Sequence, residues 1–130
     1  MIYILCALFL AIIITVMVML SDPLRKSEEK IRESLFKITP IGMDIDDVIK
    51  VIKNKKKWEL GHVNYNNGYS ILGGNPNPPS PAGDDTILGK KSIIGNIGRY
   101  MKYYIIEVEV FWAFDEDSKL IDLHVRKEGL

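Results

Sequence analysis

The sequence predicts an α+β fold in which an N-terminal transmembrane helix precedes two helices packed on an antiparallel sheet of three to five strands. Three patterns support this. An uncharged apolar run fills residues 2–20, apolar residues recur with helical spacing over 23–54, and two-residue alternation occupies 103–126. These patterns divide the 130 residues into an anchor, 1–21, and a small soluble α+β domain, 22–130.

The apolar run is the first element. Residues 2–20 contain no charge, proline or glycine, and a helix of this length rises about 28 Å, close to the thickness of a bilayer's hydrocarbon core. We therefore expect a single-pass protein of a cell membrane, with the lipid bilayer as the partner of this segment. A cleaved signal peptide is one alternative, although no basic residue precedes the run, and a buried core helix is another.

The side of the membrane on which the domain lies depends on the charges that follow the run. Loops rich in lysine and arginine remain in the cytoplasm, and these residues count more than acidic ones. The charge rule therefore predicts a cytoplasmic domain. The cations concerned are Arg25, Lys26, Lys30, Arg32 and Lys37.

Two amphipathic helices are expected next. Asp22 and Pro23 suit the N-cap and first position of a helix over 23–37, and 39–42 ends it with a proline and a glycine. Asp44 begins a second helix over 44–54. Their apolar stripes are Leu24, Ile31, Leu35 and Ile38 in the first, and Ile45, Val48, Ile49 and Ile52 in the second, while Glu28/Arg32 and Glu33/Lys37 are spaced as ion pairs.

The clearest strands form a hairpin near the C-terminus. Residues 103–114 alternate between an apolar face and a mixed face. The apolar face consists of Tyr104, Ile106, Val108, Val110, Trp112 and Phe114, and the mixed face of Tyr103, Ile105, Glu107, Glu109, Phe111 and Ala113. A turn over 115–118 leads into 119–126, where Ile121, Leu123 and Val125 face one side and Asp122, His124 and Arg126 the other. Segments 58–65, 69–72 and 91–97 are weaker strand candidates, and 73–85 is a loop rich in proline and glycine.

No group of residues predicts catalysis, a metal site or a cofactor site. His62 and His124 are the only histidines, and Cys6, the only cysteine, lies in the apolar run. The acidic clusters Asp44/Asp46/Asp47 and Asp115/Glu116/Asp117 are explained by helix capping and turn formation. Equal numbers of acidic and basic residues, 17 of each, argue against a nucleic-acid partner.

Two stretches resemble a known pattern. Ile38-Thr-Pro-Ile-Gly-Met-Asp-Ile-Asp-Asp-Val48 precedes an amphipathic helix, and Phe114-Asp-Glu-Asp-Ser-Lys-Leu120 forms the hairpin turn. They are similar to the helix-helix-sheet domain of the small accessory lipoproteins of the outer-membrane β-barrel assembly machinery and to β-lactamase-inhibitor-protein modules. This resemblance implies an extracytoplasmic domain that acts by binding other proteins. Ser118 stands where that turn usually has glycine, and no lipidation cysteine follows the apolar run.

We therefore expect a non-enzymatic, membrane-tethered protein-interaction module of the bacterial cell envelope. The alternative is a small-ligand binder or enzyme that uses a cleft beside loop 73–85, for which a polar pocket containing His62, Asp84 or Asp85 would be the evidence. Overlapping Pro-x-x-Pro spacings at Pro76, Pro78, Pro79 and Pro81 could also present a polyproline ligand.

Overall fold

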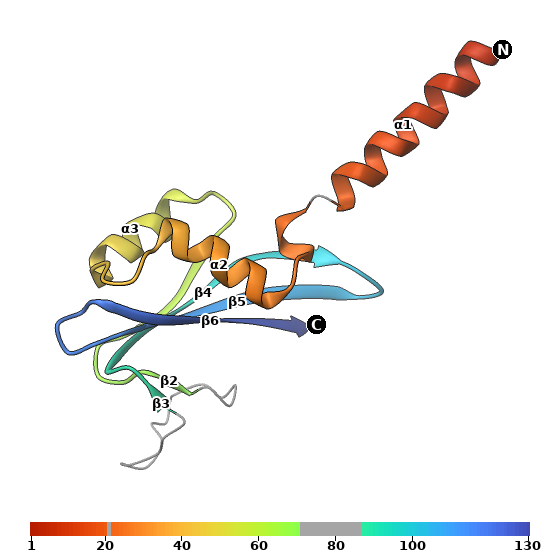
Figure 1. The fold of residues 1–130 in the computed structure, drawn as a ribbon. Helices are drawn as coiled ribbons and strands as arrows, with labels where there is room; N and C mark the ends of the chain where they lie inside the picture. Colours follow the sequence, from red (N-terminus) through yellow and green to blue (C-terminus); the bar gives the residue numbers. More distant parts are fainter. Residues whose placement is uncertain (21, 71–86) are drawn as a thin grey trace.

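The computed structural model describes residues 1–20, 22–70 and 87–130, without the side chains of 18–20, 70 and 87. The described residues form three α-helices, a short 3₁₀ turn and six strands, whose arrangement can be followed in Figure 1. In order, these are α1 (Ile2–Leu20), η1 (Pro23–Arg25), α2 (Glu28–Ile38), α3 (Ile45–Asn54), β1 (Glu59–Asn64), β2 (Tyr69–Ser70), β3 (Ile87–Leu88), β4 (Lys91–Met101), β5 (Ile105–Phe114) and β6 (Leu120–Gly129).

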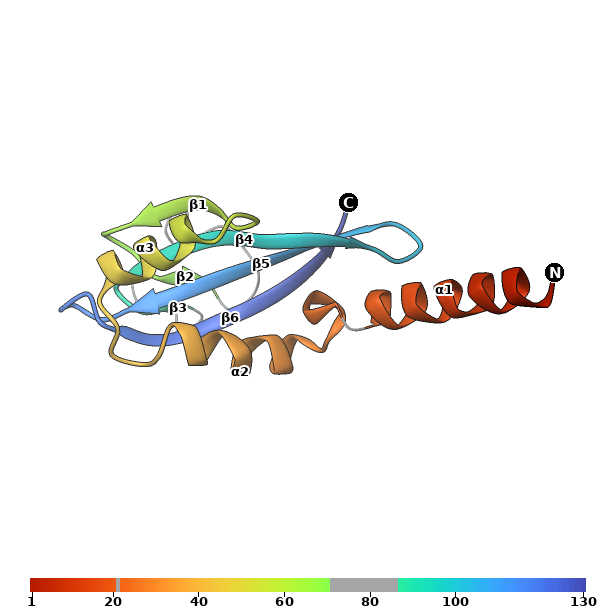
Figure 2. The same cartoon turned by 90° about the horizontal axis from the view of Figure 1, so that it is seen from above.

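The domain is a two-layer α+β arrangement. Four antiparallel strands form one sheet in the order β1-β4-β5-β6, and β2 pairs with β3 in a separate two-stranded ribbon. Helix α2 packs over β6 and α3 over β1, so both helices cover the same face of the sheet (Figures 1 and 2). The strand number of the main sheet lies within the predicted three to five.

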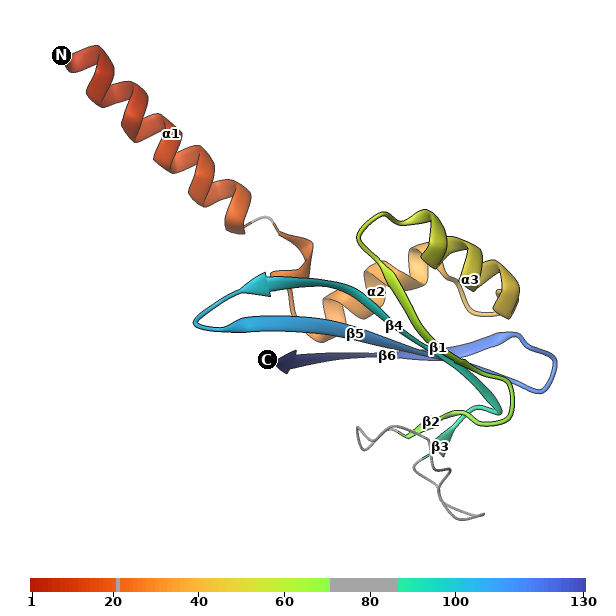
Figure 3. The same ribbon diagram turned by 180° about the vertical axis from the view of Figure 1, so that it is seen from behind.

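Helix α1 projects away from these layers (Figures 1 and 3). Across the part of the chain that the structure describes, no helix is both long enough and apolar enough to cross a membrane. This finding contradicts the predicted transmembrane helix over 2–20 and the single-pass membrane localisation.

The predicted helix over 23–37 is divided into η1 and α2. Asp22 caps η1 by accepting from the Leu24 amide at 3.0 Å, and the Ser27 hydroxyl accepts from Lys30 N at 3.2 Å to begin α2. The predicted pairing of Glu28 with Arg32 is not formed, because Arg32 reaches across to β6. Its guanidinium donates to Asp122 Oδ1 at 2.6 Å and to the Leu123 carbonyl at 3.0 Å.

Helix α3 presents Ile45, Val48 and Ile52 to the core, as its spacing predicts. Asp44 occupies the N-cap position, but its side chain makes no capping bond and instead lies 3.9 Å from the Lys119 ammonium. In α2, Ile31 and Leu35 are buried, whereas Ile38 is exposed because it lies in the last turn, where Thr39 takes the inward position.

The loop between the two helices is bonded to the β5–β6 turn. Gly42 N donates to Leu120 O at 2.8 Å, Leu120 N donates to Met43 O at 2.8 Å, and Ile45 N donates to Ser118 O at 2.9 Å. Gly42 has a φ of 90° and Ser118 a φ of 64°, so both adopt the left-handed conformation that favours glycine. The two sequence stretches that carry the family resemblance therefore contact each other.

The core lies between the helices and the inner face of the sheet. Strand β5 contributes Val108, Val110, Trp112 and Phe114, all buried as the alternation predicts. The prediction for Ile121 is wrong, since this residue is exposed. A register shift between Ala113 and Phe114 pairs Phe114 with Leu120 and Ala113 with Asp122, so Ile121 is left as the bulge residue and Leu120 packs inward in its place.

One polar contact is buried inside this core. The indole N–H of Trp112 donates to the Thr39 hydroxyl at 3.2 Å, and that hydroxyl donates to the Leu35 carbonyl at 2.9 Å. Thr39 and Trp112 are both fully buried. The contact joins the end of α2 to the middle of the sheet, and it satisfies a donor that would otherwise have no acceptor.

Candidate functional site

The histidines and acidic clusters that the sequence offers as candidate chemical groups do not lie together in the structure. His62 is exposed on β1 and His124 lies on β6, at opposite edges of the sheet. Asp115 Oδ1 accepts from the amides of Asp117 and Lys119, both at 2.9 Å, which gives this carboxylate a structural role in the turn. Among the described residues, no group of three or more histidine, cysteine, aspartate or glutamate side chains is arranged to hold a metal ion.

The proposed cleft beside loop 73–85 lies outside the described residues, together with Asp84, Asp85 and the Pro-x-x-Pro spacings. His62, the remaining member of that expected pocket, lines neither of the two pockets that stand out in the described part of the chain.

Among the described residues of the domain, exposed large apolar side chains gather at the tip of the β4–β5 hairpin. Tyr103 is 91% exposed and Met101 56%, and their neighbours are also well exposed. We call this surface the hairpin-tip patch: Met101, Tyr103, Tyr104, Ile105 and Leu130.

Backbone bonds hold the hairpin-tip patch in place. Lys102 N donates to Tyr104 O at 3.0 Å, and Leu130 N donates to Ile105 O at 2.9 Å, which brings the C-terminal residue beside the hairpin. The Arg25 guanidinium donates to the Met101 carbonyl at 2.6 Å. The patch is therefore an ordered surface linked to η1, the segment that follows α1.

Cationic groups also pack around a tyrosine just below the patch. Arg25 lies over the Tyr100 ring at 5.1 Å and Lys127 at 5.0 Å from its centroid. Lys127 Nζ also donates to the Tyr100 hydroxyl at 3.1 Å and to the Lys26 carbonyl at 2.5 Å. These contacts tie β4, β6 and η1 together.

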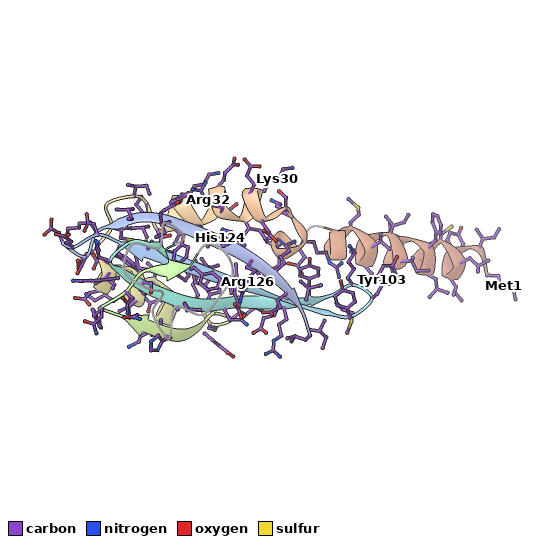
Figure 4. All side chains as sticks on the ribbon, turned by 90° about the horizontal axis from the view of Figure 1, so that it is seen from below. Met1, Lys30, Arg32, Tyr103, His124 and Arg126 are labelled. Atoms are coloured by element: carbon purple, nitrogen blue, oxygen red, sulfur yellow. The ribbon has the colours of Figure 1, made fainter. Side chains whose placement is uncertain are left out.

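The hairpin-tip patch and α1 lie at the same end of the molecule (Figures 1, 2 and 4). Figure 4 shows Tyr103 near the end of α1 that joins the domain. Most large side chains of α1 are exposed, including Leu5, Phe9 and Ile12, and Cys6 is exposed among them. We call α1 and the hairpin-tip patch together the apolar end.

The face of the sheet opposite the helices is polar and internally paired. Arg126 contacts Glu109 at 2.7 Å and Glu128 at 3.6 Å, and Arg99 lies 3.7 Å from Glu107. Figure 4 views this face, with His124 and Arg126 pointing from β6. Its charged groups are already neutralised by neighbours, which leaves less free charge for a ligand.

The β2–β3 ribbon covers one part of this polar face. Tyr69 packs against Phe111, with ring centroids 5.5 Å apart, and stacks near His124 at 6.4 Å. Burial raises the pKa of the Tyr69 hydroxyl, the negative charge of Asp122 raises it further, and Arg32 opposes both effects. The hydroxyl therefore stays protonated at neutral pH and has a packing role.

A pocket of about 420 Å³ lies on the helix side of the sheet, where η1, α2 and the start of β1 meet above β4. It is on the opposite face from His124 and separate from the hairpin-tip patch. Its apolar lining comes from Pro23, Leu24, Ile31, Leu35, Ile38, Trp58 and Ile97, and its polar lining from Asp22, Ser34, Lys57 and Arg99.

Comparison with known proteins adds no identification. No family model matches the chain, and no significant match is found to a curated protein or to a solved structure.

Sequence reasoning missed both the hairpin-tip patch and the pocket. Tyr103, Tyr104 and Ile105 were assigned to the two faces of one continuous strand, whereas β5 begins only at Ile105. The available signal was the run Met101-Lys-Tyr-Tyr-Ile105, which places large apolar residues where a hairpin must turn. The pocket had no comparable signal, since its lining comes from four separate segments.

Proposed function

We propose that this protein is a non-catalytic binding module that contacts a partner protein through its apolar end. The observation that carries this proposal is the exposure of α1 and the hairpin-tip patch together on one end of an otherwise well-packed domain. Large exposed apolar surfaces on folded proteins mark interaction sites, and tyrosine and methionine are enriched in protein interfaces.

The composition of the surface favours a protein as the partner. Tyrosines such as Tyr103 and Tyr104 supply large contact areas while keeping a hydroxyl for hydrogen bonding. The patch is held by backbone bonds and by Arg25, so little ordering entropy is lost when it binds. The resemblance to accessory modules that bind other proteins supports the same function, with a partner in the bacterial cell envelope.

Residue Cys6 allows a direct test, because it is the only cysteine and is exposed on α1. A photo-reactive maleimide attached to Cys6 would be activated in extracts of the producing organism. In a Cys6→Ser background, the same reagent would be attached to Tyr103→Cys. We expect both sites to form an adduct with the same partner protein.

The matched control is Tyr65→Cys in the Cys6→Ser background. Tyr65 is also an exposed tyrosine, but it lies between β1 and β2, at the other end of the sheet. It should give no adduct with that partner, and the double variant Tyr103→Ser/Tyr104→Ser should weaken the Cys6 adduct at least tenfold. Adducts with lipid alone, or equal adducts from all three sites, would overturn the proposal.

A further inference from the structure

We propose that the pocket between η1, α2 and β4 binds a medium-chain carboxylate, with the apolar chain in the pocket and the carboxylate at Lys57. This inference goes beyond the proposed protein-binding function and concerns a different surface of the domain. It rests on the shape of the pocket, the chemistry of its lining and the distribution of charge at its rim.

The pocket has the size and lining of a small-molecule site. Its volume of about 420 Å³ falls within the range of about 300–1,000 Å³ that is typical of ligand pockets. The apolar lining consists of aliphatic residues of η1, α2 and β4 together with Trp58. Each methylene buried there is worth about 0.8 kcal/mol, so an alkyl chain is the natural occupant.

Gly98 also lines the pocket. A Cβ there would lie 2.7 Å from Leu24 Cδ1, and Gly98 has a φ of 140°, a backbone conformation that residues with a Cβ rarely adopt. Ile31, Leu35 and Ile97 belong to the packed core, and Leu24 packs against it, which gives the pocket a fixed shape.

Charge at the rim selects the polar group of the ligand. Three charged residues line the pocket: Asp22, Lys57 and Arg99. Asp22 already accepts from the Leu24 amide at 3.0 Å, and the Arg99 side chain extends to the opposite face of the sheet, where it lies 3.7 Å from Glu107. Among the described residues, no carboxylate lies within ion-pair distance of Lys57, and Lys55 and Lys56 precede it in the chain.

A carboxylate satisfies this arrangement better than a neutral or cationic group. It pairs with Lys57 at the mouth, and the positive field of the neighbouring lysines attracts it from solution. The Ser34 hydroxyl, also at the pocket, donates to the Lys30 carbonyl at 3.0 Å, so it makes its bond within α2. Lys57 is therefore the residue that distinguishes an acid from an alcohol.

The test uses the intrinsic fluorescence of the full-length protein. The chain has two tryptophans; Trp58 lines the pocket and Trp112 is fully buried, with ring centroids 6.4 Å apart. Decanoate that carries bromine on its terminal carbon, kept below its micelle concentration, should quench the fluorescence saturably. Because bromine quenches at short range, ligand adsorbed on α1 instead of in the pocket would contribute little.

Two pairs of variants separate the pocket from general adsorption. Ser34→Phe should fill the pocket and abolish saturable quenching. Glu33→Phe, at an exposed position of α2 one residue earlier, should leave the quenching unchanged. Lys57→Gln should weaken binding about tenfold, whereas Lys56→Gln should change it less than twofold. Brominated decanol should bind about tenfold more weakly than the acid.

Three results would overturn the inference. Equal quenching in the Ser34→Phe and Glu33→Phe proteins would place the ligand outside the pocket. Equal affinity for the acid and the alcohol, or equal loss in Lys57→Gln and Lys56→Gln, would show that Lys57 does not recognise a carboxylate. Circular dichroism of each variant shows whether its fold is retained before binding is compared.

Discussion

The two faces of the four-stranded sheet are stabilised in different ways. The face under α2 and α3 is a continuous apolar core in which Val108, Val110 and Trp112 are completely buried. The opposite face carries ion pairs such as Arg126–Glu109, and its described residues pack as a small apolar cluster where the β2–β3 ribbon covers Phe111. Burial of apolar area on the first face dominates the free energy of folding, while each ion pair on the second face contributes little net free energy.

This difference explains why the sheet needs only one layer of helices. One face of an antiparallel sheet can be exposed to water when every second side chain of its strands is polar. In β5, Glu107 and Glu109 supply these polar side chains. The polar face uses pairing between neighbouring strands to neutralise its charges. Substitutions on the two faces should therefore differ in size, and the following predictions test that difference.

The largest effect is expected from Leu123→Ala on the core face. Leu123 is almost completely buried among the core residues, so its truncation should cost about 2–5 kcal/mol of unfolding free energy. Its neighbour His124 points to the opposite face, and His124→Ala should cost about 1 kcal/mol or less. Urea denaturation followed by circular dichroism measures both, and equal losses would refute the contrast between the faces.

Next in size is the effect of removing the polar link between Trp112 and Thr39 inside the core. Thr39→Val keeps the shape of the side chain but leaves the Trp112 indole N–H buried without its acceptor, which should cost about 1–3 kcal/mol. Thr39→Ser keeps the hydroxyl and should be less destabilising. If the valine variant were as stable as the parent in urea, the Trp112–Thr39 hydrogen bond would make no net contribution to the free energy of unfolding.

A pH effect is expected from the ribbon-covered part of the polar face. The folded-state pKa of Tyr69 is raised, so above about pH 10 the unfolded chain loses this proton while the folded state retains it. Stability should then fall by about 1.4 kcal/mol per pH unit as pH rises above 10. The comparison is made by urea denaturation at pH 9 and pH 11.

The Tyr69→Phe variant is the matched control for this effect. It lacks the titrating hydroxyl, so its stability should fall less between pH 9 and pH 11 than that of the parent. An identical loss in both proteins would mean that other tyrosines and lysines cause the change.

The smallest effect concerns the ion pair between β5 and β6. The Arg126 and Glu109 side chains meet at 2.7 Å and are half-buried. A double-mutant cycle with Arg126→Met and Glu109→Gln should give a coupling of about 0.2–1 kcal/mol, smaller in 1 M salt than in 0.1 M. A coupling as large as the cost of Leu123→Ala would show that the polar face contributes more than the comparison allows.

Much of the domain could be predicted from local pattern. The periodicity of 44–54 predicted α3, and the alternation from Ile106 to Phe114 predicted both the strand and its inward face. Strands were also predicted at 58–65 and 91–97, where β1 and β4 lie. These elements were predictable because one buried face leaves a repeating signature in the sequence.

Other features required contacts between distant residues. The predicted helix over 23–37 is divided because Ser27 caps α2. Arg32 pairs with Asp122 on β6 instead of with Glu28 on its own helix. Ile121 was placed on the wrong face because a bulge changes the register, and a single extra residue reverses every side chain that follows. The membrane-spanning prediction for 2–20 rested on hydropathy and length, and the described helices contradict it.

The sequence by itself determined the α+β class, the amphipathic helices and the apolar face of the hairpin, because each depends on residues close together in the chain. Only the tertiary structure decided which surfaces remained available. It placed the hairpin-tip patch at the same end as α1, and it formed a pocket from η1, α2, Trp58 and β4. Such sites arise where separate segments come into contact, and the periodic pattern of one segment does not predict which other segments it will contact.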